Sequence, residues 1–254
     1  MLTALTRAVS SRVNECELTF IDRAPINFDQ AVRQHQNYQE LLRSLGVSVT
    51  QIAAQDDCPD CCFLEDTALV LDELAVITRP GSEARRREVE GVVPTIRNYR
   101  NQIVAIEPPA TLEGGDVLRV RRKLFVGITE RTNRDGIESL RQFVAPYGYT
   151  VESVNVPGAL HLKSVCTAVD EHTILVEPSR LDLSTFSEFD VIEVPPEEWM
   201  AANILLVNKT VCMHSGFGKT QRRLQSRGFD VRTVDISEFL KAEAGLTCMS
   251  LLFQ

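Results

Sequence analysis

The chain has 254 residues, of which 44% are hydrophobic and 24% charged, and these proportions exclude a disordered, collagen-like or coiled-coil protein. Its formal net charge of −8 argues against a nucleic-acid partner, because proteins that bind nucleic acids carry dense Lys and Arg surfaces. No apolar run is longer than four residues, so we expect neither a membrane-spanning helix nor a membrane partner.

Strand and helix patterns follow one another along the whole chain. The amino-terminal part predicts a strand at 3–8, a helix at 28–45 and a strand at 47–52. Beyond it, pairs of short apolar runs joined by polar turns predict β-hairpins at 68–78, 116–128, 164–176 and 203–214. Polar helix-like stretches are expected at 83–97, 134–147 and 219–227, and further strands at 102–107, 150–156, 189–194 and 230–236.

These elements repeat in the order strand, strand, helix, strand. Comparable units open near Glu65, Gly115, His161, Asn203 and Gly245, about 40 to 50 residues apart. The last unit has no helix pattern, and the amino-terminal strand, helix and strand supply what it lacks. We therefore expect an α/β fold, a closed five-bladed α/β propeller of pseudo-symmetric ββαβ units, with residues 1–254 as a single domain.

The sequence has seven cysteines, and its start, with Arg7 and Arg12, lacks the apolar core of a signal peptide. We therefore expect a cytoplasmic protein with free thiols. Three cysteines form the cluster Cys58-Pro-Asp-Cys61-Cys62. Such a cluster can be half of a zinc site or a redox pair, but nothing in the sequence completes either site, so structural thiols in a tight loop are the simpler interpretation.

Acidic and basic residues stand out beside these apolar runs. Asp60, Glu65 and Asp66 surround a short apolar stretch, where they form either a solvated loop or a pocket for a cationic group such as a guanidinium. Arg85 and Arg131 follow the first two hairpins; isolated arginines usually lie on the surface, but two that face a pocket would bind a carboxylate. A site with both kinds of charge suits a zwitterionic, arginine-like ligand.

Three further residues combine into a possible catalytic group. Cys248, His161 and Glu113 supply a thiol, an imidazole and a carboxylate, which is the nucleophile, base and orienting group of covalent catalysis. Taken alone, the histidine and the cysteine would be read as core residues. Each of the three, however, lies where a different unit opens, and equivalent positions of a closed ring converge on its axis.

Six motifs, in this order and spacing, resemble the dimethylarginine dimethylaminohydrolase family over nearly the whole chain. They are Cys58-Pro-Asp-Cys-Cys-Phe-Leu-Glu-Asp66, Ile77-Thr-Arg-Pro-Gly81 with Arg85-Arg86, Thr111-Leu-Glu-Gly-Gly-Asp116, Arg131-Thr-Asn133, Leu160-His-Leu-Lys163 and Leu246-Thr-Cys-Met-Ser250. The resemblance implies the five-bladed fold of the guanidine-modifying superfamily. It also implies hydrolysis of Nω-methylated arginines to citrulline and methylamine or dimethylamine, with no cofactor and no metal.

The resemblance further implies residue roles. Cys248 is the expected nucleophile, His161 the general acid and base, and Glu113 the group that orients His161. The expected substrate-binding residues are Asp60, Glu65, Asp66, Arg85 and Arg131, with backbone groups of Leu18 and Ala242. Two departures from the family pattern are the run Cys61-Cys62-Phe-Leu64 and the small side chain of Ala242, which could loosen one pocket wall.

Other functions remain open at this point. An arginine deiminase would use the same site on free arginine, and an amidinotransferase would pass the same covalent intermediate to an amine, although both families usually have longer chains. A non-catalytic zinc or redox module built on Cys58, Cys61 and Cys62 is a different class. The sequence leaves the choice between monomer and homodimer open.

Overall fold

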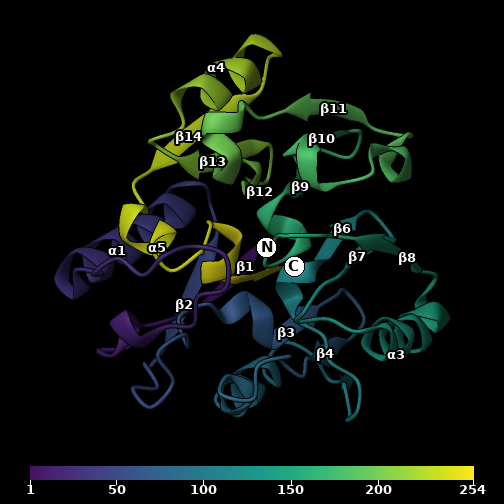
Figure 1. Ribbon diagram of the computed structural model, residues 1–254. Coiled ribbons are helices and arrows are strands. Elements are labelled where there is room, and N and C mark those ends of the chain that lie inside the picture. Colours follow the sequence, from purple (N-terminus) through teal and green to yellow (C-terminus); the bar gives the residue numbers. More distant parts are fainter.

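Five three-stranded sheets surround a common centre in the computed structural model, which describes residues 1–254 (Figure 1). In four of them the strands follow one another along the chain. These sheets are β3–β4–β5 (Ala68–Val70, Ala75–Ile77, Ile103–Ala105), β6–β7–β8 (Val117–Val120, Lys123–Ile128, Thr150–Asn155), β9–β10–β11 (Cys166–Ala168, Thr173–Val176, Asp190–Glu193) and β12–β13–β14 (Leu205–Val207, Thr210–His214, Asp230–Val234). Within each, the first two strands are antiparallel and the third is parallel to the second.

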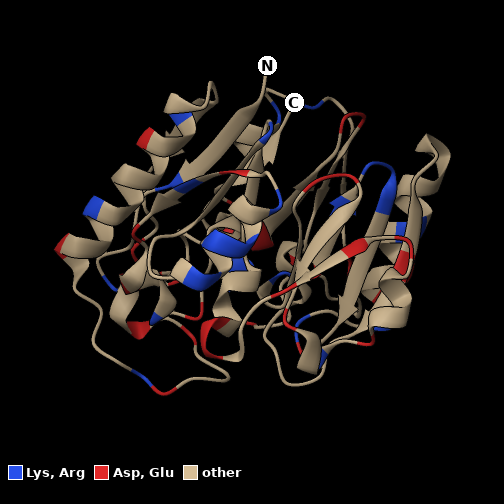
Figure 2. Cartoon of the chain, turned by 90° about the horizontal axis from the view of Figure 1, so that it is seen from above, with Lys and Arg blue, Asp and Glu red and all other residues tan.

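The fifth sheet joins the two ends of the chain. Strand β15 (Leu251–Phe253) pairs antiparallel with β1 (Thr3–Arg7), and β1 pairs in parallel with β2 (Ser48–Ile52). The amino and carboxyl ends accordingly lie side by side in Figures 1 and 2. The predicted five-bladed α/β fold, with its last unit completed by the amino-terminal elements, is confirmed.

Helical segments on the outside of the ring connect the two parallel strands of each sheet, because a parallel pair needs a long crossover (Figure 1). The α-helices are α1 (Phe28–Ser44), α2 (Val93–Ile96), α3 (Arg134–Val144), α4 (Gly218–Ser226) and α5 (Ser237–Leu240). Helix α3 buries Ile137, Leu140 and Val144, which share one face at helical spacing, and the Asn133 side chain caps its first turn. Gly228 ends α4 with a left-handed φ of 88°. No helix is both long and apolar enough to span a membrane.

One predicted helix is different in the structure. The stretch 83–97 forms a 3-10 turn, η3 (Arg86–Val89), and the short helix α2 instead of one continuous helix. Pro94 lies in the first turn of α2, where its missing N–H costs nothing but where a longer helix would lose a hydrogen bond. Gly91 lies between the two segments, and a Cβ there would be 2.7 Å from the Arg7 guanidinium.

The interior of the ring combines a central cavity with packed sheets around it. The first strands of the five units, β3, β6, β9, β12 and β15, line the cavity. Apolar side chains fill the space between neighbouring sheets in several clusters, of which the largest contains Cys62, Phe63, Leu246 and Met249. Close packing of these four residues fixes the segments that carry the acidic residues and Cys248.

Lys and Arg are interspersed with Asp and Glu in the view of Figure 2.

Candidate active site

A short 3-10 turn precedes the first strand in most units, and these turns carry the candidate residues. The turns are η2 (Leu64–Thr67) before β3, η4 (Gly114–Asp116) before β6, η6 (Leu162–Ser164) before β9 and η10 (Thr247–Met249) before β15. Asp66 lies in η2 and Cys248 in η10, whereas Glu113 and His161 directly precede η4 and η6. The candidate residues therefore all lie within five residues before the first strand of four different units.

Hydrogen bonds join these turns into a closed ring. They run from Gly115 N to Asp66 Oδ1 (2.9 Å), Leu162 N to Asp116 Oδ1 (2.9 Å), Asn203 Nδ2 to Lys163 O (2.9 Å), Thr247 N to Asn203 Oδ1 (3.1 Å) and Thr247 Oγ1 to Glu65 Oε2 (2.7 Å). Almost all of these donors and acceptors are buried, so losing any one leaves an unpaired polar group. The ring holds the candidate residues at fixed positions relative to one another.

One cavity beside this ring collects most of the residues selected from the sequence. Its wall contains Asp60, Asp66, Arg85, Arg131, His161, Ala242 and Cys248. Glu17, Phe63, Leu160, Glu243 and Ala244 complete it. Both charge types are present, as a pocket for a zwitterion requires.

Glu113 lies behind the cavity, fully buried, and holds the imidazole of His161. His161 Nε2 donates to Glu113 Oε2 at 2.7 Å, and Gly81 N donates to the other carboxylate oxygen at 3.0 Å. Burial alone would lower the pKa of His161, but Asp66, Asp116 and Glu113 outweigh it and raise the pKa to about 9. The ring is therefore an imidazolium at neutral pH, ready to donate a proton.

Asp66 and Arg85 form a buried ion pair next to this imidazolium. Arg85 Nη1 donates to Asp66 Oδ2 at 2.8 Å, and its Nε and Nη2 donate to the carboxylate of Glu88. Despite burial, His161 and Arg85 lower the pKa of Asp66 to about 2. Burial raises the pKa of Asp60, which accepts the Glu17 N–H. These two carboxylates give the cavity affinity for a cation.

Cys248 is the one cysteine that is not fully buried. The backbone N–H of Gly245 donates to its sulfur at 3.4 Å. Loss of solvation and the nearby carboxylates of Glu65 and Asp66 raise the pKa of the thiol to about 12. The free protein thus holds a neutral thiol, and a cation beside the sulfur is needed to favour the thiolate.

Three expected substrate-binding residues either lie outside this cavity or bond their side chains to other residues. Glu65 pairs with Lys163 at 2.5 Å and lines the central cavity. Leu18 is half-buried and packs on the core next to the cavity residue Glu17. Arg85 lines the cavity, but most of its N–H groups are already bonded to Asp66, Glu88 and the Phe63 carbonyl.

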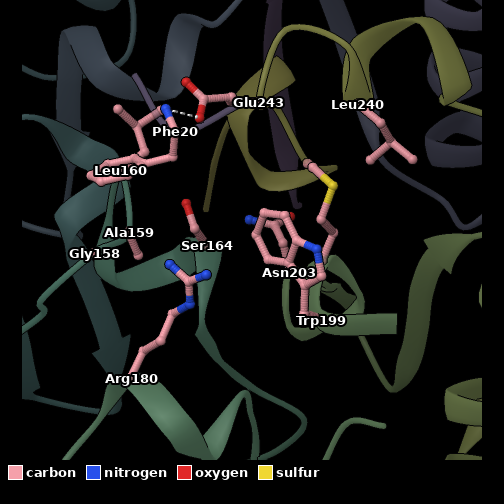
Figure 3. A pocket seen from close by; sticks show the side chains of 12 residues that line it. Phe20, Gly158, Ala159, Leu160, Ser164, Arg180, Trp199, Asn203, Leu240 and Glu243 are labelled. Atoms are coloured by element: carbon pink, nitrogen blue, oxygen red, sulfur yellow. Dashed lines mark hydrogen bonds between the residues drawn. The ribbon is translucent and has the colours of Figure 1, made fainter. Parts of the chain in front are cut away.

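A second cavity borders the first and shares Leu160 and Glu243 with it (Figure 3). Phe20 and Trp199 contribute aromatic rings to its wall, and Arg180 lies over the Trp199 ring at 5.4 Å. Figure 3 shows Glu243 accepting the Phe20 N–H, at 2.7 Å. Glu243 thus fixes the chain segment at the rim of both cavities.

A family model described as "N,N dimethylarginine dimethylhydrolase, eukaryotic" matches residues 5–251. The chain belongs to the dimethylarginine dimethylaminohydrolase family. The N(G),N(G)-dimethylarginine dimethylaminohydrolase of Pseudomonas aeruginosa is 33% identical to it over 228 residues, which are 89% of this chain and 90% of the relative. The enzyme of the same name from Streptomyces coelicolor is 36% identical over 98% of this chain and 95% of its own length.

Solved dimethylarginine dimethylaminohydrolase structures show the same fold. A Cys-to-Ser variant of the Pseudomonas aeruginosa protein complexed with citrulline has a TM-score of 0.93 at 30% identity, covering 99% of this chain and 98% of that one. A His-to-Gly variant in an adduct with S-methyl-L-thiocitrulline has a TM-score of 0.95 at 30% identity, covering 99% of both chains.

Sequence reasoning gave no role to several residues that support this candidate site. Asp116 accepts from Leu162 N and Thr129 Oγ1, and Glu88 holds Arg85. The Arg85–Glu88 spacing of three residues was a local signal for that pair. The contacts of Glu17 and Glu243 bridge distant parts of the chain, and no local pattern reveals them.

The only group of side chains close enough to share a metal ion is Asp66, Glu113 and His161, whose ligand atoms lie within 4.8 Å of one another. His161 already bonds to Glu113, and the Asp66 carboxylate already bonds to Arg85, so a metal would have to replace the imidazolium proton. Cys58, Cys61 and Cys62 are buried free thiols outside this group, and burial raises the pKa of Cys61 to about 11.

The elevated pKa of Cys248 predicts slow alkylation at neutral pH. Because the thiolate is the reactive form, its alkylation rate by iodoacetamide should rise about tenfold per pH unit between neutral pH and about pH 9. Peptide mass spectrometry of Cys248 at several pH values checks this. A rate independent of pH over that range would show a thiol already ionised in the free protein.

Proposed function

We propose that this chain hydrolyses Nω-methylated arginines, asymmetric dimethylarginine and monomethylarginine, to citrulline plus dimethylamine or methylamine. The observation that carries the proposal is the cavity that joins the Cys248 thiol, the His161 imidazolium and the Asp66 carboxylate. Relatives with the dimethylarginine dimethylaminohydrolase name match nearly the whole chain, and one solved relative holds citrulline, the expected product.

Binding begins with charge pairing in this scheme. Asp60 and Asp66 attract the methylated guanidinium, and Arg131 receives the carboxylate at the other end of the ligand. The backbone groups of Leu18 and Ala242 receive the α-ammonium. Glu65 and Arg85 support the site through Lys163, Thr247 and Asp66 rather than through free side-chain donors or acceptors.

Bound guanidinium then enables the first half-reaction. Its positive charge favours the thiolate of Cys248, which attacks the guanidinium carbon. The bond from this carbon to the methylated nitrogen breaks as His161 gives that nitrogen a proton, so the amine leaves as a neutral molecule. A thiouronium on Cys248 remains.

Water completes the cycle in the second half-reaction. His161, now neutral and still held by Glu113, takes a proton from a water molecule that attacks the thiouronium carbon. The C–S bond breaks, the proton of the new hydroxyl group passes to the departing sulfur, and neutral citrulline and the neutral Cys248 thiol result. No step in this scheme needs a cofactor or a metal.

The site residues all belong to one ring, and we propose that residues 1–254 act as a single catalytic domain. All seven cysteines are free thiols, which favours a reducing, cytoplasmic location for the enzyme. Both a monomer and a homodimer are compatible with a site built from one chain.

Citrulline formation tests the function directly. The protein is incubated separately with arginine, monomethylarginine and asymmetric dimethylarginine, and citrulline is quantified. We expect product from the two methylated substrates. Product from arginine alone would make the protein an arginine deiminase, and no product from any substrate would refute hydrolysis.

Substitutions at the two ends of the cavity should weaken substrate binding. Asp66→Asn and Arg131→Ala each remove one half of a charge match, and losing such a partner in a desolvated site costs roughly 2–5 kcal/mol. We expect a KM at least about thirtyfold higher for each variant. Steady-state kinetics measures it, with the exposed neighbours Asp135→Asn and Arg134→Ala as matched controls. Unchanged KM values for both cavity variants would show that the assigned ligand position is wrong.

A further inference from the structure

Arg131 is the cavity's cation with the most freedom to change partners. Arg85 bonds through Nε, Nη1 and Nη2 to buried acceptors, whereas Arg131 Nη1 contacts Glu17 at 3.0 Å and its Nη2 contacts Thr19 Oγ1 at 3.4 Å. The Glu113 carboxylate lies 3.7 Å from Arg131 Nη1, but it is committed to His161 and to the Gly81 N–H. Glu17 is therefore the exchangeable partner of Arg131.

Glu17 places its carboxylate where a carboxylate of the ligand would bind. One oxygen faces Arg131, and the other accepts from Ser82 Oγ at 2.5 Å. The Glu17 side chain is 33% exposed, compared with 11% for Arg131, so Glu17 can move into solvent while the guanidinium stays in the wall. An arginine fork binds carboxylates with the same geometry whether they come from a side chain or from a free amino acid.

The segment that carries Glu17 is anchored independently of this carboxylate. The Glu17 N–H donates to Asp60, and the N–H groups of Thr19 and Phe20 donate to the two oxygens of Glu243 at 2.6 and 2.7 Å. Figure 3 shows the second of these contacts to Glu243, from Phe20. These three backbone hydrogen bonds remain when only the charge of Glu17 is removed. Neutralising Glu17 therefore changes the competition for Arg131 and leaves the position of the segment unchanged.

We propose that Glu17 is an internal competitor for the carboxylate end of the substrate and so sets the affinity for α-amino acids; this rests on the proposed function. Substrate binding exchanges one carboxylate on Arg131 for another. The enzyme must break the Glu17–Arg131 pair before the substrate carboxylate can take its place, and this cost weakens binding.

Kinetics of Glu17→Gln test the proposal. Since a partly exposed ion pair is lost, we expect the KM for asymmetric dimethylarginine to fall roughly three- to fivefold with kcat unchanged. The KM for the decarboxylated analogue, an amine with the same dimethylguanidinium group, should stay the same. Glu17→Ala should give the same two results, so the test does not depend on the amide that Glu17→Gln introduces.

A double-mutant cycle locates the effect on Arg131. In an Arg131→Ala background, Glu17→Gln should no longer change KM. Glu15→Gln is the matched control, because Glu15 lies two residues away, pairs with Arg12 on the surface and is far more exposed.

A KM that is unchanged or higher in Glu17→Gln would overturn the proposal, as would an equal shift for the decarboxylated analogue. Wild-type activity is measured first. If the wild-type protein forms no citrulline, the proposed function fails; if it turns over but Glu17→Gln behaves otherwise than expected, only the competition by Glu17 fails.

Discussion

His161→Gly should separate the two half-reactions of the proposed mechanism. With asymmetric dimethylarginine, we expect turnover to fall on the order of 10²- to 10⁴-fold, because the leaving amine loses its acid and the water its base. S-methyl-L-thiocitrulline carries a sulfur leaving group that departs without a proton. With this substrate the C–S bond to the methylthio group breaks, the thiouronium forms on Cys248, and the enzyme then stalls.

Mass spectrometry of the intact protein detects that stall as a stable adduct, and peptide mass spectrometry locates it on Cys248. A His-to-Gly variant of a solved dimethylarginine dimethylaminohydrolase forms an adduct with the same compound, which agrees with the expectation. His172→Gly is the matched control, because His172 is exposed and contacts Arg121 on the surface. An adduct on any of the other six cysteines, or rapid turnover without an adduct, would contradict the roles of His161 and Cys248.

Cys248→Ser should abolish turnover and leave binding intact. A hydroxyl has nearly the shape of a thiol, but its pKa is so high that a bound guanidinium cannot ionise it. Removing the nucleophile of a catalytic group costs on the order of 10⁴-fold or more in kcat. Citrulline formation measures the loss, and calorimetric titration with asymmetric dimethylarginine measures binding.

Cys58→Ser serves as the control for this substitution, since Cys58 is a buried thiol outside the cavity. We expect it to keep its kcat. If Cys248→Ser turned over at the wild-type rate, or if Cys58→Ser lost activity without losing stability, the nucleophile would lie elsewhere.

The ring of units could be predicted because the sequence patterns that indicate it are local. Hairpin turns, β-branched runs and helix-ending glycines lie within a few residues of the structure that they determine. The continuous helix expected at 83–97 was wrong in part for a local reason, Pro94, and in part for a distant one. Gly91 packs against Arg7, and no nearby residue predicts that contact.

The direction of individual side chains in the site was harder to predict from the sequence. Glu65 and Asp66 are neighbours on a 3-10 turn, where consecutive side chains point about 120° apart. Asp66 consequently lines the cavity, whereas Glu65 turns toward Lys163. The Glu17–Arg131 pair joins residues 114 positions apart, so only the closed ring brings them together.

The hydrogen-bonded ring of turns has a consequence for how such a site can diversify. Each unit offers a short segment just before its first strand, and four of these segments hold chemically different groups: Asp66, Glu113, His161 and Cys248. A repeated backbone arrangement therefore carries side chains with different roles. A substitution in one segment can replace the nucleophile or the proton donor while the other units keep their shape. New chemistry can therefore arise without a new fold.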